Sequence, residues 1–440
     1  MNYYFINKMK TLGELGVKIP KILLPKNLDI KTWATIACDQ YTQDKNYWRQ
    51  VYSIVGSKPS TVKMTFPEVY LGENGRQERI QNIKKEMNTY INQGIFSPPQ
   101  EEIIYLERTT RYGRVRHGLV VAIDLDCYEW KPFSKALIRA TEATIVERIP
   151  PRMEIRKEAI IETPHIMLLV NDPNHSLVEG LGKRVVKNRP LYQGELMMNS
   201  GSVRGWGISN EYDIEYFRKT LQNLAEKNME KDGSIFLFAV GDGNHSLATA
   251  KATWEEYKKN HPGEKNCNMK YALIEIVNIY DTGLTFEPIH RVLFDIDPDS
   301  LVNFIGNGLG QIENLNSFDE LKEKVDHSKS DFGFIFEKNG KMQFIFMKTG
   351  IKELPISQLQ PAIDQFLASC NKKGSIDFIH GADELLRLGS QKGVTAIYLP
   401  PIDKDSFFST INGKGPLPRK SFSMGEADEK RFYLECRQIV

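Results

Sequence analysis

Residues 235–259 read IFLFAVGDGNHSLATAKATWEEYKK, and the expected fold is built outward from this stretch. Its first six residues form an apolar run rich in strand-forming side chains, and apolar residues recur at helical spacing from Leu247 onward. In the turn between them, Gly241 and Gly243 permit backbone angles and a close ligand approach that a side chain would forbid. Asn244 or Ser246 is expected to cap the helix. The pattern therefore predicts a strand, a tight turn and a helix.

The turn at 241–246 is expected to bind an anion. Such a turn directs several backbone N–H groups and the positive end of the helix dipole at one spot, which suits a phosphate or a carboxylate. Asp242 would add an acid and His245 an imidazole. The plainer interpretation is a capped strand-to-helix turn whose histidine faces solvent.

Two better-known phosphate motifs do not fit this turn. The order Gly241-x-Gly243-x-x-Ser246 lacks the third glycine of the dinucleotide fingerprint, and no acidic residue clearly ends a following strand. The chain also has no Gly-Lys-Ser/Thr, so it lacks a P-loop. A nicotinamide-dependent oxidoreductase would rest on this incomplete glycine pattern alone.

The composition limits the number of domains and the kinds of partner. With 440 residues, 41% hydrophobic and 26% charged, the chain is long enough for two or three domains with their own cores. Its 58 Lys and Arg against 56 Asp and Glu leave a net charge of +2, which implies no bulk attraction to nucleic acid or to an anionic membrane. Any anion site must be local.

Cysteine usage and hydropathy indicate the compartment. The five cysteines are far apart and never form Cys-x-x-Cys, which argues against a disulfide framework or a zinc site and fits a reducing cytoplasm. No apolar run reaches about 18 residues, so we expect neither export nor a membrane span. A homo-oligomer stays open.

Strand and helix patterns alternate along the chain, which predicts a mixed α/β (α+β) fold of mixed sheets with flanking helices. Pro150-Pro151 is expected to end any helix there, and Gly306-Asn-Gly308 to break one. Asn339-Gly340 predicts a tight hairpin. The principal predicted strands are 102–107, 119–124, 165–170, 235–240 and 270–280, and the principal helices are 79–93, 212–230 and 356–370.

Further candidate residues stand where predicted strands end. The apolar run from Trp33 ends in Asp39 and Gln40 just before a predicted helix, a junction typical of the mouth of a site. A simple turn capped by Asp39 is the alternative. His290 and Arg291 follow a proline where a strand or loop could reach the turn at 241–246.

The run 138–152 mixes arginines with hydroxyls and carboxylates. Arg139 and Arg148 would grip a phosphate, with Thr141 and Glu142 between them, and an internal ion-pair network is the alternative. Near the C-terminus, Arg419 and Lys420 lie in a basic, proline-containing segment that would serve as a lid over an anion or as a solvated loop.

Metal-cage and hydrolase motifs do not occur in the sequence. There is no His-Glu-x-x-His, no acidic calcium loop and no Gly-x-Ser-x-Gly. Mg²⁺ brought in with a phosphate needs only one or two carboxylates. Phosphoryl transfer needs little beyond positioning and charge neutralisation, with a carboxylate or histidine orienting the acceptor hydroxyl.

Several motifs together and in order resemble those of the DUF1015 family. They are TIACDQYT at 35–42, IRATEAT at 138–144, ERIPPR at 147–152, GDGNH at 241–245, HRV at 290–292, IDFIHG at 376–381 and PRKS at 418–421. The loop at 241–245 is similar to the phosphate loop of the ParB/sulfiredoxin-like superfamily, which includes free-serine kinases. One departure is Ser246, which stands where many relatives have Arg; Arg139 or Arg291 would then substitute.

The resemblance implies a ParB/sulfiredoxin-like core at 136–293, between an N-terminal α+β region at 1–135 and a C-terminal α+β region at 294–440 that completes the site. It also implies a cytoplasmic phosphotransferase for a small hydroxyl substrate, with free L-serine the best guess, pyrophosphate or a nucleotide as donor, and Mg²⁺ bound with the donor. Glu142, Asp242 and His245 would be catalytic. The phosphate would be held by Gly241, Gly243, Asn244, Ser246, Arg139, Arg148, Arg291, Arg419 and Lys420, and the substrate by Asp39, Gln40, Thr141 and His290.

A second hypothesis is a non-catalytic ParB-like regulator that binds a nucleotide or nucleic acid. The near-zero net charge and the lack of a helix-turn-helix signal argue against nucleic acid as the partner.

Overall fold

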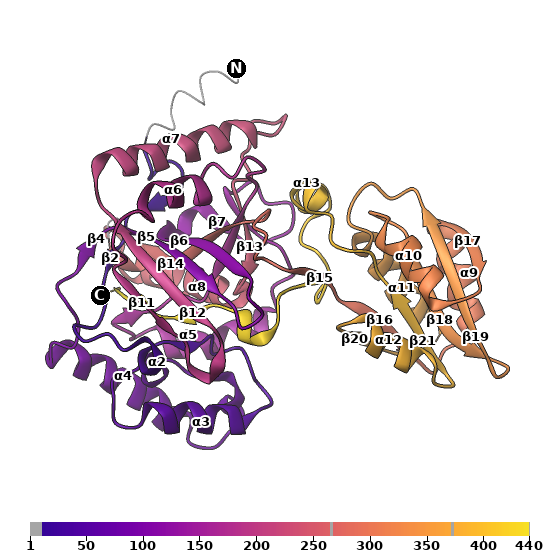
Figure 1. Ribbon diagram of the computed structural model, residues 1–440, viewed down its shortest axis with the longest axis horizontal. Coiled ribbons are helices and arrows are strands. Elements are labelled where there is room, and N and C mark those ends of the chain that lie inside the picture. Colours follow the sequence, from indigo (N-terminus) through magenta and orange to yellow (C-terminus); the bar gives the residue numbers. More distant parts are fainter. Residues whose placement is uncertain (1–10, 265–266, 371–373, 440) are drawn as a thin grey trace. The chain divides into compact units, whose positions relative to one another are not determined.

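The computed structural model describes residues 11–264, 267–370 and 374–439. Its backbone divides into two compact units, which are described separately (Figure 1). Unit 1 comprises the chain up to Ala140, Thr144–Leu284 and the stretch from Gly425 onward, whereas unit 2 comprises Thr141–Ala143 and Thr285–Met424. The chain thus returns to unit 1 after completing unit 2. The three-part division expected from the sequence stays a prediction.

Unit 1 is built on a mixed sheet of ten strands within the described residues. β10 is parallel to β14, and β8 is parallel to β13 and β7, while the remaining pairs are antiparallel. In sheet order the strands are β11 (Tyr192–Glu195), β12 (Ser202–Ile208), β5 (Ile103–Thr109), β6 (Val115–Asp124), β14 (Tyr271–Asn278), β10 (Met167–Val170), β13 (Phe238–Asp242), β8 (Ile138–Ala140) and β7 (Tyr128–Glu129), with β1 (Val17–Lys18) beside β6.

Both faces of this sheet are buried, each in its own hydrophobic core. Successive side chains of a strand point to opposite faces, so one strand contributes to both cores. On β5, Tyr105 enters the core formed with α6 (Val178–Val185), α7 (Glu211–Lys227) and α8 (Asn244–Asn260). Ile104 and Leu106 enter the opposite core, formed with α2 (Ile30–Trp33), α3 (Lys45–Val55) and α4 (Arg76–Asn92). Figure 1 shows α6 and α7 on one side of the sheet and α3 and α4 on the other. The predicted mixed sheet with flanking helices is confirmed.

The C-terminal stretch of unit 1 adds short strands to segments from the first half of the chain. β23 (Phe432–Tyr433) pairs with β3 (Thr35–Ile36), and β24 (Arg437–Gln438) pairs with β9 (Ile161–Glu162). A further short pair joins β2 (Lys21–Ile22) to β4 (Gln100–Glu101). The last residues of the chain therefore reach the segments that carry Cys38 and His165.

Unit 2 contains a six-stranded antiparallel sheet within the described residues. Its strands, in order, are β17 (Gly310–Leu315), β19 (Lys341–Thr349), β18 (Phe332–Lys338), β21 (Val394–Tyr398), β16 (His290–Phe294) and β20 (Ser375–Ile379), and β15 (Phe286–Pro288) pairs with β22 (Phe422–Met424). Its helices are α9 (Pro298–Leu309), α10 (Phe318–Asp326), α11 (Ile356–Ser369), α12 (Ala382–Gly389) and α13 (Lys404–Lys414).

Three local predictions were wrong. Gly243, not Asn244 or Ser246, is the N-cap of α8, so those two residues lie inside the first turn. Pro150 and Pro151 begin α5 (Ile149–Arg156) instead of ending a helix, because proline is tolerated where its missing N–H has no partner anyway. α9 runs through Gly306 and Gly308 to Leu309. The hairpin around Asn339-Gly340 is confirmed by β18 and β19. None of the described helices combines the length and the apolar composition needed to cross a bilayer.

Candidate functional site

Gly243 determines the backbone path of the loop after β13. Gly243 has a φ of +81°, and a Cβ there would lie 3.0 Å from Cγ1 and 3.1 Å from Cα of Ile166. Glycine therefore supplies both the left-handed backbone angle and the close approach to the segment before β10. Gly243, the N-cap of α8, has no side chain that could cap the helix, and Leu247 N–H donates to the Gly243 carbonyl at 2.9 Å.

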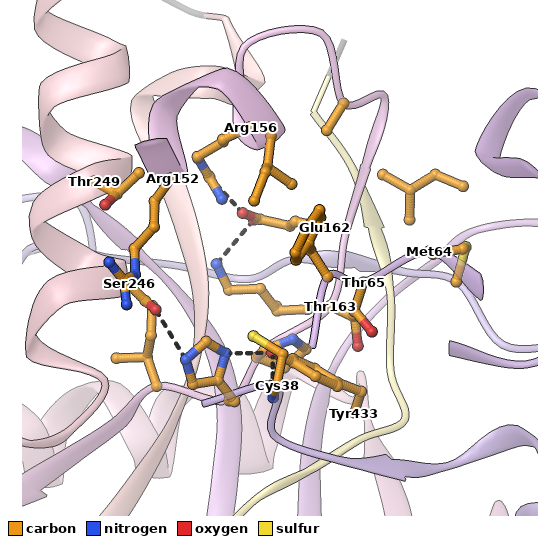
Figure 2. Close-up of a pocket in the computed structure, with 18 of the residues that line it drawn as sticks. Cys38, Met64, Thr65, Arg152, Arg156, Glu162, Thr163, Ser246, Thr249 and Tyr433 are labelled. Carbon is orange, nitrogen blue, oxygen red and sulfur yellow. Dashed lines mark hydrogen bonds and ion pairs between the residues drawn. The ribbon is translucent and has the colours of Figure 1, made fainter. Parts of the chain in front are cut away.

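A cavity of about 160 Å³ lies beside the first turns of α8 (Figure 2). Ser246 and Thr249 of this helix line it. Its other polar lining residues are Cys38, Thr65, Glu68, Arg152, Arg156, Glu162, Thr163, His165 and Tyr433, and its apolar walls include Met64, Phe66, Leu71, Met87, Ile155, Ile161 and Leu273. All of these residues belong to unit 1.

His165 links helix α8 to the C-terminal stretch. Its Nε2 lies 2.9 Å from Oγ of Ser246, and its Nδ1 lies 2.9 Å from the hydroxyl of Tyr433. The Tyr433 oxygen accepts the Cys38 N–H at 3.2 Å. Burial raises the pKa of both Tyr433 and the Cys38 thiol well above their ordinary values, so both stay protonated at neutral pH.

Two carboxylates and a guanidinium complete this cluster. Oδ2 of Asp39 lies 3.8 Å from Nε2 of His165, and Oδ1 accepts the Gln40 amide at 3.0 Å. Glu68 accepts Nε of Arg152 at 2.9 Å. Burial raises the pKa of Glu68 even though Arg152 opposes the shift, and the nearby charge of Asp39 adds to it. Arg152, His165 and Glu68 therefore line one cavity, and Asp39 lies next to the His165 ring.

Asp242 and His245 of the loop are held by their own contacts. Asp242 accepts the Gly243 N–H at 3.0 Å, and its Oδ2 lies 3.6 Å from Nζ of Lys430. Nε2 of His245 accepts the N–H of Ile145 at 3.3 Å. One of its ring nitrogens is thus engaged by the backbone, and the imidazole that contacts Ser246 is that of His165.

Unit 2 holds most of the remaining predicted site residues. The Thr141 carbonyl accepts the Leu417 N–H at 2.7 Å, and Glu142 accepts the Ser421 N–H at 3.3 Å. Arg291 is fully buried and donates to the Lys420 carbonyl at 2.9 Å. Burial lowers the pKa of Arg291 to about 10, against the opposing pull of Glu142.

His290 is also buried, and its Nδ1 accepts the Leu399 N–H at 3.1 Å. Burial lowers the pKa of His290 to about 4, so the ring is neutral at pH 7. Arg419 and Lys420 are exposed, and Nζ of Lys420 lies 5.0 Å from the ring centre of Phe378. Unit 2 therefore brings together Glu142, Arg291 and Lys420.

Arg139 and Arg148 belong to neither group. Arg139 is buried on β8, where its Nε donates to the Ala136 carbonyl at 2.9 Å and its guanidinium lies 4.5 Å from the ring centre of Phe236. This contact is at the entry to β13, whereas the loop follows its exit. Arg148 is exposed, and its carbonyl accepts from Arg152 at 2.9 Å. That all the predicted segments share one pocket stays a prediction.

The residues that the structure places at the cavity or the loop, and that the prediction omitted, include Glu68, His165, Lys430 and Tyr433. Arg152 and Cys38 stood in quoted motifs but were given no role. The sequence placed His165 only as the first residue of the predicted strand 165–170, without a role in the site. Among the residues that the structure describes, no three His, Cys, Asp or Glu side chains are grouped to hold a metal ion.

A family model described as "Protein of unknown function (DUF1015)" matches residues 21–366. The chain belongs to the DUF1015 family. No curated protein matches this DUF1015 chain. The ParB/sulfiredoxin-like assignment of its core stays a prediction.

Solved structures that are similar to the DUF1015 chain include a free serine kinase in complex with AMP, at 11% identity and a TM-score of 0.37, covering 72% of this chain and 90% of the kinase. A conserved hypothetical protein from Pyrococcus furiosus has 10% identity and a TM-score of 0.34, with 72% and 90% covered. SbnI with a C-terminal truncation, from Staphylococcus aureus, has 8% identity and a TM-score of 0.35, with 70% and 83% covered.

Proposed function

We propose that this DUF1015 protein is a phosphotransferase that moves a phosphoryl group to the hydroxyl of a small molecule. Free L-serine is the proposed acceptor, and pyrophosphate or a nucleotide the donor. One observation carries the proposal: Ser246, in the first turn of α8, lines a cavity that Arg152 and His165 also line.

The donor phosphate would lie against the first turn of α8. The N–H groups of a helix's first turn and its dipole favour a negative charge. Asn244 and Ser246 lie in that turn, Gly243 is its N-cap, and Gly241 is in the preceding strand β13. Arg152 adds a guanidinium that lines the same cavity. Lys430, 3.6 Å from Asp242, adds a second cation at the loop. The phosphate contacts expected of Arg139, Arg148, Arg291, Arg419 and Lys420 stay predictions.

The acceptor would lie beside Asp39. Its carboxylate lies 3.8 Å from Nε2 of His165, the nitrogen that also contacts Ser246, so it would take the proton of a hydroxyl that attacks phosphorus. Gln40, which already contacts Asp39, would hold the amino acid with it. A cavity of about 160 Å³ is of the size that holds benzene, and L-serine has only one heavy atom more. Roles for Glu142, Asp242, His245, Thr141 and His290 stay predictions.

Mg²⁺ is proposed to enter with the donor. Mg²⁺ typically keeps several waters and binds through one or two carboxylates plus substrate phosphates, and it would neutralise phosphate charge. Asp242 stands at the loop that would hold those phosphates, with Oδ2 facing Lys430 instead of a second acid. A single carboxylate at that point fits an ion carried by the phosphate.

The test is to incubate the purified full-length protein with L-serine, Mg²⁺ and, in separate reactions, pyrophosphate, ADP or ATP. We expect phosphoserine, detected by mass spectrometry, with at least one donor. L-Alanine, which lacks the hydroxyl, is the matched control and should give no product. Failure to form phosphoserine with any donor would overturn the proposed acceptor and donors together.

A further inference from the structure

Ser246 and His165 form a hydroxyl–imidazole pair inside the cavity. Oγ of Ser246 lies 2.9 Å from Nε2 of His165, and both residues line the same cavity. His165 is 8% exposed, so its ring is held away from bulk water. A hydroxyl within hydrogen-bond reach of an imidazole that is itself oriented by a third group is the usual arrangement of an activated nucleophile.

The other hydroxyls of α8 show that this orientation is specific to Ser246. Thr249 donates to the His245 carbonyl at 2.7 Å, and Thr253 donates to the Thr249 carbonyl at 2.8 Å. Both bonds return to the helix backbone four residues earlier, as is common for hydroxyls inside helices. Ser246 instead contacts an imidazole from another segment. Its hydroxyl is not the cap of α8 either, because Gly243 holds that position.

Tyr433 orients the ring of His165. The Tyr433 oxygen accepts the Cys38 N–H at 3.2 Å. The same oxygen lies 2.9 Å from Nδ1 of His165, so an Nδ1–H can donate to its remaining lone pair. In the tautomer that carries Nδ1–H, Nε2 of the neutral ring accepts the Ser246 O–H. In that tautomer His165 is a base toward Ser246.

We propose that Ser246 is a nucleophile that takes the phosphoryl group from the donor and passes it to the acceptor, so that transfer proceeds through phospho-Ser246. This inference rests on the proposed phosphotransferase function. A phosphate on Ser246 would stand in the first turn of α8, where the helix dipole stabilises it, and beside Arg152.

The two steps balance. In the first, Oγ of Ser246 bonds to the phosphorus of the donor, its proton moves to Nε2 of His165, and the donor's bridging P–O bond breaks with its electron pair leaving on the released phosphate or nucleotide. In the second, the acceptor hydroxyl loses its proton to Asp39 and bonds to phosphorus, while Oγ leaves and takes the proton back from His165. The net proton is released from Asp39 to solvent.

The experiment uses the full chain with Mg²⁺ and either [³²P]pyrophosphate or [γ-³²P]ATP, without any acceptor. We expect acid-stable label on the protein and, after proteolysis, on the peptide that contains Ser246. We also expect [³²P]phosphate to exchange into pyrophosphate without acceptor, because the first step is reversible. Adding L-serine should then remove the label as phosphoserine.

Variants locate the label. Ser246→Ala should abolish it and Ser246→Thr should retain part of it, whereas Ser234→Ala, which removes a serine outside the cavity, should leave it unchanged. His165→Gln should slow labelling by about 10²- to 10⁴-fold, the usual contribution of a positioned base. Thermal unfolding of each variant shows whether it is folded, and the wild-type labelling is decisive without them.

Each outcome bears on one proposal or on both. Phosphoserine formation without protein-bound label, or at full rate in a folded Ser246→Ala variant, would overturn the intermediate and leave the kinase. Label on Ser246 with no transfer to L-serine would support the nucleophile and overturn the proposed acceptor. Absence of both label and product with every donor would overturn both.

Discussion

The hydroxyl of Tyr433 lies 2.9 Å from Nδ1 of His165, although 268 residues separate them in the sequence. The contact exists because the chain leaves unit 1 after Leu284, builds unit 2 and returns at Gly425, where β23 pairs with β3. Tyr433 and Ile439, from the C-terminal stretch, therefore line a cavity whose other lining residues lie between Cys38 and Leu273 in the sequence. Tyr433 is a positioning residue in this arrangement, since it acts through His165.

Tyr433→Phe should lower kcat for phosphoryl transfer while leaving KM for both substrates nearly unchanged. The ring would still fill its place, but Nδ1 of His165 would lose the oxygen that orients the imidazole. Loss of such control in a serine-protease triad lowers kcat by about 10⁴-fold, and we expect at least a tenfold fall here. Steady-state kinetics measure the split. A parallel rise in KM with an unchanged kcat would show that Tyr433 serves binding and not the imidazole.

Variants of the Arg152–Glu68 ion pair distinguish the effect of Arg152 on donor binding from its effect on the stability of the fold. Arg152→Ala should raise KM for the donor about tenfold or more and lower the free energy of unfolding by about 1–3 kcal/mol, because it leaves a half-buried carboxylate without its partner. Adding Glu68→Gln should restore part of the stability and none of the donor affinity. Urea unfolding and donor KM are the two measurements. Recovery of donor affinity in the double variant would mean that Arg152 acts only by pairing with Glu68.

The loop and its neighbouring elements could be predicted because their signals are local. Strand β13 and helix α8 follow from an apolar run and a helical period, and the glycine in the turn follows from the backbone it must adopt. The cap was misplaced because the N-cap is a left-handed glycine, which has no capping side chain that the sequence pattern could indicate. The family motifs predicted Asp39 and the loop as parts of a site, and this stays a prediction.

The partners of Ser246 could not be predicted for a different reason. His165 and Tyr433 reach the cavity through strand pairings between segments hundreds of residues apart, and nothing in their spacing records those pairings. His245 attracted the prediction because it adjoins the glycines, yet one of its ring nitrogens binds the Ile145 backbone. Arg291 and Arg139 were predicted to contact phosphate because the sequence does not show that both side chains are buried.

Glu162 should make stability depend on pH. Burial opposes its ionisation, but Arg437 and Arg156 outweigh that effect and lower its pKa below the ordinary value of 4.5. A carboxylate with a lowered folded pKa contributes stability above its ordinary pKa, and this contribution is lost as the pH falls through the folded pKa. Glu162→Gln should therefore lose about 3–5 kcal/mol at pH 7 by leaving Arg437 buried without a carboxylate.

Urea unfolding between pH 6 and pH 3 checks the direction of the Glu162 pKa shift. The difference in free energy of unfolding between wild type and Glu162→Gln should narrow below pH 4.5, because the Glu162 carboxyl of the unfolded chain becomes protonated there before that of the folded protein. Glu158→Gln is the control, because Glu158 is an exposed partner of Lys84, and it should leave stability nearly unchanged at every pH. A gap that widens on acidification would contradict the assigned direction of the Glu162 pKa.

Comparing Gly243→Ala with a control variant shows whether the loss comes from displacing the loop or only from the strained backbone angle. Gly233 is the matched control, because its φ of +84° is nearly the same as the +81° of Gly243, and a Cβ there would meet nothing within 4 Å. Gly233→Ala should cost about 1–2 kcal/mol for the left-handed angle and leave activity intact. Gly243→Ala should cost more, since its Cβ would lie 3.1 Å from the Ile166 backbone, and it should raise KM for the donor as the start of α8 moves. Equal losses of stability in the two variants with unchanged donor KM would show that the loop does not hold the phosphate through its backbone.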